Sequence, residues 1–512
     1  MNTRNVIGLS LVLVLMALAA SLPSAATAVS DVVQGMPNEP LIQVSDDPFT
    51  NPTSQHRTEV EPDSFAFGST WVSAFQAGRF FDTGASDIGF ATSSDEGHSF
   101  VEGFLPGVTA FSDPAGAYDR ASDPTVAFDL RDHVWLISYI AIHDTGIVDV
   151  LVSRSRDAVH WDLPVPVATL NTSLDKSWTT CDNSPPSPFY GHCYTELNGP
   201  SPGFPLQMTT SNDGGATWGA AQTAASGNSG QPLVQPSGRV VVPFFGLCAG
   251  RAQLCAITSD NGGDRWTTPT AIATRIFHPT APRVRTPPLP SAAVDREGRV
   301  YVVWKDCRFE AGCTANDPVL STSDDGTHWS DVQRIPLDPV GSNVDHFVPG
   351  IGVDPESAGS EARLALTYYF LPDASCTLAT CVLEVGFVSS TDGGQTWTTP
   401  EVLGDPMELG WLALTNQGRM VGDYISTSVF NGGALVLPAF AAASPPEPDG
   451  TFHEAIFTTR EAVREGGVAS DHDVVMSGDT SNQSRGSPSA LKSQASSREG
   501  IPQTADDREA ER

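Results

Sequence analysis

The chain has 512 residues, including 46 Gly and 40 Pro, and a formal net charge of −32 at pH 7. Binding to nucleic acid requires a basic surface that faces the phosphates, so this charge excludes nucleic acid as the expected partner and disfavours anionic membranes. An acidic surface of this kind keeps a protein soluble.

The first 28 residues have the organisation of a secretory signal peptide. Arg4 gives a positive start, residues 6–20 form an apolar stretch, and Ala26-Thr27-Ala28 is a cleavage motif. The apolar stretch is shorter than a membrane span requires, and no later stretch is long enough. We therefore expect a secreted protein, extracellular or periplasmic, that is cleaved near Ala28 and has no membrane span.

A short turn motif recurs six times along the chain. Its fullest form runs from Ser390 through Asp392, Gly393 and Gly394 to Trp397. The Ser and Asp side chains can accept hydrogen bonds from nearby backbone N–H groups, and Gly can adopt the positive φ that the turn requires. The other copies are centred on Asp95, Asp157, Asp213, Asn261 and Asp325, and those at Asp157 and Asp325 are one residue shorter. Such repetition between short strands is typical of a β-propeller.

Hairpin patterns alternate with these turns. Each pattern is a pair of β-branched or aromatic runs separated by a polar turn. The pairs begin near Glu61, Asp123, Lys176, Gln231, Pro290, Pro349 and Gly422. A hairpin followed by a turn-motif hairpin makes one four-stranded blade. We therefore predict an all-β propeller of six or seven blades over residues 29–460, with seven favoured by the count.

The two ends of this domain are expected to meet. Residues 41–44 and 452–458 have strand patterns that can share one blade, which would hide edge strands that otherwise invite aggregation. Residues 461–512 are rich in Ser, Gly, Asp, Glu and Gln with almost no aromatic residues. We predict that this polar C-terminal tail is disordered, because it cannot bury a core.

The eight cysteines fall into four close couples, which are Cys181/Cys193, Cys248/Cys255, Cys307/Cys313 and Cys376/Cys381. In an exported protein, four local disulfides are the simplest interpretation. A zinc site would need two couples brought together with His, and the sequence has no C-x-x-C motif. We expect no metal, no cofactor and a monomeric protein.

The six turns resemble the Asp-box, or BNR, repeat of sialidases and related β-propellers. Over about residues 39–460 the chain also looks like secreted bacterial sialidase-like proteins, and three runs carry this resemblance, at 120–124, 190–194 and 418–426. The resemblance implies that the boxes are structural and that catalysis occurs at the opposite, axial mouth. It also implies three Arg that clamp a substrate carboxylate, an Asp acid/base, and a Tyr nucleophile assisted by Glu.

The resemblance places the catalytic groups at Asp82 as acid/base, Tyr424 as nucleophile and Glu196 as the assisting base. An anionic substrate would raise the pKa of Asp82 so that it holds a proton. The candidate substrate-binding arginines are Arg57, Arg79, Arg308 and Arg419. Arg57 departs from the family pattern, because the family has Arg-Ile-Pro where this chain continues with Thr and Glu.

The Cys181/Cys193 loop is a second candidate binding element. It brings His192 and Tyr194 close to a disulfide, and we expect it to lie over the mouth with its aromatic rings facing sugars. Three functions remain open. The first is a sialidase-like glycoside hydrolase acting on sialic-acid-type or other acidic glycans. The others are a propeller that binds glycan or protein without catalysis, and a polysaccharide lyase that uses His192 and Tyr194.

Overall fold

The computed structural model describes residues 40–172, 174–199, 205–280, 284–287, 289–430 and 432–466. They belong to one structural unit that begins at Glu39. The predicted signal peptide lies outside the described residues. Apart from two 3₁₀ turns, Gly359–Glu361 and Leu409–Trp411, every regular element is a β-strand. In this part of the chain, no helix has the length and apolar character needed to cross a membrane.

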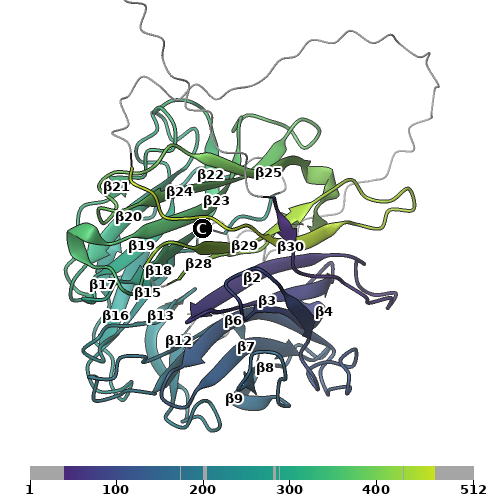
Figure 1. The fold of residues 1–512 in the computed structure, drawn as a ribbon, viewed down its shortest axis with the longest axis horizontal. Helices are drawn as coiled ribbons and strands as arrows, with labels where there is room; N and C mark the ends of the chain where they lie inside the picture. Colours follow the sequence, from purple (N-terminus) through teal and green to yellow (C-terminus); the bar gives the residue numbers. More distant parts are fainter. Residues whose placement is uncertain are drawn as a thin grey trace, which may run out of the picture. The chain divides into compact units, whose positions relative to one another are not determined.

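Two sheets of eight strands make up the first half of the chain (Figure 1). The first contains β2 Glu59–Phe67, β3 Thr70–Arg79, β4 Ala85–Ser93, β5 Val101–Phe104, β6 Arg120–Asp129, β7 Val134–Ile142, β8 Val148–Ser155 and β9 Val165–Thr172. The second contains β10 Asp175–Cys181, β11 Cys193–Asn198, β12 Pro205–Ser211, β13 Gln222–Asn228, β14 Leu233–Val234, β15 Val240–Cys248, β16 Arg251–Ser259 and β17 Thr270–Ala273. Each is two antiparallel sets of four strands joined by a short pairing, β4 with β6 and β13 with β15.

Three sheets of four strands and one hairpin follow. The two central sheets are β18 Ser291–Val294, β19 Val300–Asp306, β20 Asp317–Ser323 and β21 Gln333–Arg334, then β22 Asp345–Val353, β23 Leu364–Leu371, β24 Val382–Ser390 and β25 Glu401–Glu408. The hairpin is β26 Ala413–Thr415 with β27 Gly418–Met420. The last sheet is β28 Ser426–Val429, β29 Val436–Ala443, β30 Glu454–Thr458 and β1 Ile42–Gln43 (Figure 1).

The two ends of the domain meet as expected from the sequence. Ile42 pairs with Thr458, so β1 supplies the outer strand of the last sheet. The first strands of the successive sets, β2, β6, β10, β14, β18, β22 and β28, contact one another in that order, and β28 contacts β2. This closed cycle is the strand arrangement of a β-propeller. Beyond the last strand, Glu461 still pairs with Val436, and residues 467–512 of the predicted tail lie outside the described residues.

Four first strands carry a β-bulge near their beginning. At each bulge the strand register shifts, and one residue other than Gly adopts a positive φ. These residues are Glu61 (φ 60°), Asp123 (φ 52°), Lys176 (φ 49°) and Val348 (φ 48°). In three of them the next residue is Pro, which has no N–H for the ladder and therefore favours a bulge. Such a conformation costs about 1–3 kcal/mol per residue.

The repeated turns share one set of hydrogen bonds. In the sixth turn, Ser390 Oγ donates to Asp392 Oδ1 (2.8 Å), and Thr396 donates its N–H to Oδ1 (2.8 Å) and its Oγ1–H to Oδ2 (2.6 Å). Gly394, at φ 85°, donates its N–H to Ser390 Oγ (3.0 Å). The carboxylate therefore satisfies the donors of its own turn, which is a structural role.

The two shorter turns reach the same carboxylate oxygen in another way. There the residue three positions after the Asp is His, and its Nδ1 bonds to Oδ2, at 2.8 Å from His160 to Asp157 and at 2.7 Å from His328 to Asp325. A turn that is one residue shorter moves the donor back by one position. The longer imidazole side chain restores the contact that Thr makes in the full-length turn.

The four predicted disulfides are all present, as Cys181–Cys193, Cys248–Cys255, Cys307–Cys313 and Cys376–Cys381. Each joins neighbouring strands or the loop between them, so each closes a short segment within one sheet. Disulfides of this kind persist in oxidising compartments such as the extracellular space.

Candidate functional site

Charged side chains gather at the mouth, which is the end of the strands opposite to the repeated turns. The bulges of β2, β6 and β10 supply Glu61, Asp123 and Lys176, and connecting segments supply Arg285 and Asp423. The charges of the other four groups all act on the Glu61 carboxyl group, so the five lie together. We call these five residues the mouth cluster.

Glu61 is the most enclosed member of the mouth cluster, with 1% of its surface exposed. Its Oε2 accepts a hydrogen bond from Gln76 Nε2, and its Oε1 accepts one from the Asp423 backbone N–H (3.3 Å). Burial, followed by the charges of Asp123 and Asp423, raises the pKa of Glu61 well above its usual value. The carboxyl group therefore holds its proton at a pH at which an exposed glutamate is ionised.

Arg285 and Asp423 form a bidentate ion pair. Arg285 Nε donates to Asp423 Oδ1 (2.7 Å), and Arg285 Nη2 donates to Asp423 Oδ2. Burial lowers the pKa of Arg285, but the charge and hydrogen bonds of Asp423 outweigh it, and the net pKa is raised. The Arg285 guanidinium therefore stays charged, and the paired geometry makes this a strong charge-assisted contact.

A crossing segment brings Arg285 to this place. Val284 forms a parallel bridge with Arg419 of β27, and the Arg285 N–H donates to the Arg419 carbonyl (2.8 Å). From the other side, the buried Lys305 of β19 donates through Nζ to the Thr286 carbonyl (2.5 Å). Segment 284–287 is thus held between β19 and the β26–β27 hairpin.

Lys176 faces two aromatic rings. Its Nζ lies 3.9 Å from the ring centre of Tyr424 and 4.7 Å from that of Trp178, and the two rings meet edge to face. The side chain is 8% exposed, and Nζ has no hydrogen-bond acceptor among the described residues. The contacts of Nζ in this part of the chain are therefore the two ring faces, with acidic groups acting on it from a longer distance.

Asp82, the predicted acid/base, lies outside the mouth cluster. Its side chain is 61% exposed and forms an ion pair with Arg120 Nη1 (2.5 Å). Although desolvation raises the pKa of Asp82, the hydrogen bond and charge of Arg120 outweigh it, and the net pKa is lowered. The Arg120 contact therefore favours the ionised form of Asp82, whereas a general acid has to hold a proton.

The four predicted substrate-binding arginines are each engaged by the chain. Arg57 contacts His453 (3.2 Å), and Arg308 binds Asp306 with two prongs (2.8 and 2.7 Å). Arg419 donates to the Leu412 carbonyl (2.5 Å). Arg79 is 2% exposed and donates to the Phe80 carbonyl (2.7 Å), and burial lowers its pKa to about 10. Only Arg79 and Arg419 lie next to the mouth cluster, and they do not form an open clamp there.

Tyr424 and Glu196 are both buried beside the mouth cluster. The Tyr424 hydroxyl donates to the Pro124 carbonyl (2.8 Å), and burial raises its pKa well above its usual value. Glu196 is fully buried, and burial raises its pKa as well, against the smaller opposing effects of the Gly230 backbone and the Asn198 side chain. Tyr424 is therefore a neutral donor to the backbone, and we see no contact by which Glu196 would activate it.

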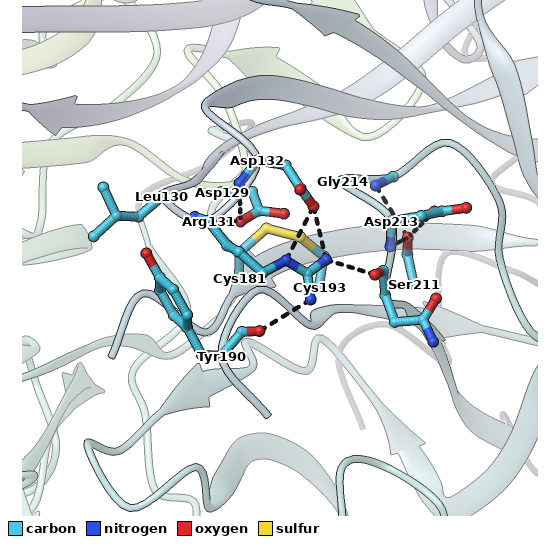
Figure 2. A network of polar contacts seen from close by, with 12 residues as sticks. Asp129, Leu130, Arg131, Asp132, Cys181, Tyr190, Cys193, Ser211, Asp213 and Gly214 are labelled. Carbon is cyan, nitrogen blue, oxygen red and sulfur yellow. Dashed lines mark hydrogen bonds and ion pairs between the residues drawn. A yellow bond between two sulfur atoms is a disulfide. The ribbon is translucent and has the colours of Figure 1, made fainter. Parts of the chain in front are cut away.

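His192 and Tyr194 lie at the end of the strands that carries the repeated turns. Figure 2 shows the Cys181–Cys193 disulfide beside Arg131, whose Nη2 binds Asp132 (2.7 Å) and whose Nη1 binds the Tyr190 carbonyl (3.1 Å). Cys181 lies five positions after Lys176 along β10, which is about 17 Å along a strand. The disulfide loop therefore lies away from the mouth, contrary to our expectation from the sequence.

One group among the described residues has side chains close enough to hold a metal ion, namely Asp317, Asp338 and His346. Arg334 already occupies it, because its Nη2 binds Asp317 (2.7 Å) and Asp338 (2.5 Å). The guanidinium group supplies the positive charge that a cation would bring, so this group has the character of an ion-pair network.

The sequence analysis did not identify Glu61, Asp123 or Lys176 as site residues. For two of them, however, the neighbouring residues indicate a β-bulge. Glu61 and Asp123 are each followed by Pro at the start of a predicted strand. A charged residue before Pro at the start of a strand indicates a bulge that can turn the charge out of the ladder. Arg285 carries no such signal, because its partner is distant in the chain.

Comparisons with known proteins place this chain near no named family. No protein-family model matches it, and no curated protein matches it. Similar solved structures include an ulvan lyase of polysaccharide lyase family PL25 (TM-score 0.48, 9% identity, 83% of this chain and 96% of that one). They also include the GH93 α-L-arabinofuranosidase of Fusarium graminearum (0.45, 11%, 83% and 98%) and a Hadza microbial sialidase (0.42, 15%, 77% and 76%). At these TM-scores the likeness assigns neither family nor activity.

Proposed function

We propose that the chain is a glycan-cleaving enzyme of the glycoside hydrolase class and that the mouth cluster is its active site. The observation that carries this proposal is the strained backbone of three first strands, β2, β6 and β10. At equivalent bulges they present Glu61, Asp123 and Lys176 in left-handed conformations. Strain of this kind costs stability and concentrates at functional sites.

The chemistry needs two carboxyl groups in different protonation states. Glu61, with its raised pKa, would donate a proton to the glycosidic oxygen as the bond from that oxygen to the anomeric carbon breaks. Asp123 would either attack the anomeric carbon or take a proton from the attacking water. In both routes the water hydroxyl ends on the sugar, and the remaining proton returns to the enzyme.

In this proposal Glu61 and Asp123 take the roles that the sequence analysis gave to Asp82 and Tyr424. The Asp82 carboxylate is paired with Arg120, and the Tyr424 hydroxyl is committed to a carbonyl. Sialic acid remains one substrate to test, but the engaged arginines give it no special support. The lyase alternative relied on His192 and Tyr194 at the mouth, and both residues lie at the other end of the strands.

We also propose that the ring contains seven blades, six of which carry an Asp box, and that the protein is a secreted monomer cleaved near Ala28. Support for seven blades comes from the cycle of seven first strands. In this description the β26–β27 hairpin is an insertion at the mouth and not part of a blade. Support for secretion comes from the four disulfides.

The test is an activity screen of the purified chain against neutral exo-glycosides, sialosides and uronate polymers. Release of new reducing ends reports cleavage by either reaction, and ultraviolet absorbance of an unsaturated product distinguishes a lyase from a hydrolase. The anomeric configuration of the first product, followed by NMR, tells whether Asp123 acts as nucleophile (retention) or as base (inversion). Binding without any turnover would make the chain a glycan-binding propeller and would contradict the proposal.

A further inference from the structure

Lys176 has an unusual balance of contacts for a buried ammonium group. It can donate three hydrogen bonds, and none of them has an acceptor among the described residues. No carboxylate of the described chain lies within ion-pair distance of it, whereas Arg285 has Asp423. Leaving a buried donor without a partner costs more than the net gain of a typical hydrogen bond.

A second buried lysine at the mouth provides the contrast. Lys305 Nζ donates to the Thr286 carbonyl (2.5 Å), to Thr286 Oγ1 (2.9 Å) and to Thr280 Oγ1 (3.4 Å). Its three donors are therefore satisfied by Thr286 of the crossing segment and by Thr280. The open donors of Lys176 are a property of that position and not of every lysine that this fold buries.

The surroundings of Lys176 match one kind of ligand group. The Tyr424 and Trp178 rings beside the ammonium offer apolar faces that can pack against the C–H groups of a sugar. A desolvated ammonium is compensated better by an anion than by a neutral hydroxyl. The carboxyl groups that act on Lys176 electrostatically include Glu61, Glu196 and Asp175, and none of them lies within ion-pair distance of its Nζ.

We infer that Lys176 binds the carboxylate of an acidic sugar residue, with Trp178 and Tyr424 packing against that sugar. This inference rests on the proposed function, because it names the substrate class of the same site. The flexible stem of lysine lets the ammonium group exchange its ring contacts for ligand oxygens. The bulge at Lys176 fixes where that stem begins.

The experiment measures binding of the full chain by calorimetry to sialyllactose and to an oligogalacturonate. The carboxyl-reduced counterpart of each ligand and a sulfated neutral oligosaccharide complete the set. Wild type is expected to bind at least one of the carboxylated ligands about tenfold or more tightly than its reduced form, the usual size of a charge-assisted contact. Lys176→Met should remove this preference without lowering the midpoint of thermal unfolding, because the substitution breaks no hydrogen bond of Nζ.

Lys305→Met is the matched control. It should keep the preference for the carboxylate and lower the unfolding midpoint, because it leaves the Thr286 carbonyl without its donor. Equal binding of carboxylated and reduced ligands by wild type, or an unchanged preference in Lys176→Met, would overturn the inference. If the sulfated ligand binds as tightly as the carboxylated ligands, and this binding also depends on Lys176, the restriction of the site to carboxylates is overturned. Lys176-dependent binding without turnover would refute the hydrolase and leave the inference standing.

Discussion

Arg285 and Asp423 are 138 positions apart in the chain, yet they form a two-pronged ion pair at the mouth of the ring. Their side chains are 19% and 14% exposed. The pair joins the segment before β18 to the segment before β28. It also fixes the backbone N–H of Asp423, which donates to the Glu61 carboxyl group.

Removing one member of this pair should be strongly destabilising. Arg285→Met leaves the Asp423 carboxylate uncompensated, and we expect a loss of about 3 kcal/mol in unfolding free energy, as for other buried pairs. Urea unfolding measures this loss. The exposed pair of Arg299 and Asp324 provides the control, because Arg299→Met should cost less than about 1 kcal/mol. Equal losses of unfolding free energy in both variants would show that the Arg285 pair stabilises the fold no more than an exposed ion pair does.

The two shorter repeated turns should depend on their histidines. His160→Ala removes the donor to Asp157 Oδ2 and should cost about 0.5–1 kcal/mol, the value of one net hydrogen bond. His98 lies in a full-length turn, where Ser99 Oγ reaches the carboxylate and the imidazole contacts the Asp95 backbone carbonyl instead (2.5 Å). Each substitution removes one imidazole contact, but only His160 binds a charged acceptor, so we expect the larger loss of unfolding free energy in His160→Ala. An equal or larger loss in His98→Ala would show that the contact to the carboxylate is not what the shorter turn depends on.

Buried carboxyl groups predict that stability falls as pH rises. Burial raises the pKa of Asp63 to about 7 and that of Asp87 to about 8, from 3.8 in an exposed Asp. Between about pH 4 and pH 8 the unfolded chain releases these protons while the folded chain retains them. The unfolding free energy should therefore decrease over this range.

Thermal unfolding followed from pH 4 to pH 8 measures this trend. Asp87→Asn, which cannot ionise, should show a smaller decrease in unfolding temperature than wild type. A wild-type unfolding temperature that increases toward pH 8 would contradict the assignment of these groups as protonated in the fold.

The parts of the fold that sequence patterns predict are local. The turn hydrogen bonds of Asp392 reach four residues along the chain, and each disulfide joins cysteines at most 12 positions apart. Such contacts appear as short motifs in the sequence. The pairing of β1 with β30 was also predictable, because both segments lacked another partner in the strand count.

The site was less predictable because it depends on distant contacts and on burial. The sequence cannot show that Arg120 neutralises Asp82 or that Arg285 crosses to Asp423. The sequence analysis also expected His192 at the mouth. The direction in which β10 runs decides at which end of the strands the Cys181–Cys193 disulfide lies, and a local motif does not show that direction. Pro62 and Pro124 were the available signal for the bulges at the mouth.

The most direct test of the account compares turnover of Glu61→Gln with that of Asp82→Asn on the best glycan substrate of the wild type. Glu61→Gln keeps the shape of the side chain but cannot donate the proton, and we expect kcat to fall by about 10²–10⁴ with binding retained. Asp82→Asn should turn over at close to the wild-type rate. Full activity in Glu61→Gln, with loss of activity in Asp82→Asn, would contradict the account and would restore Asp82 as the acid.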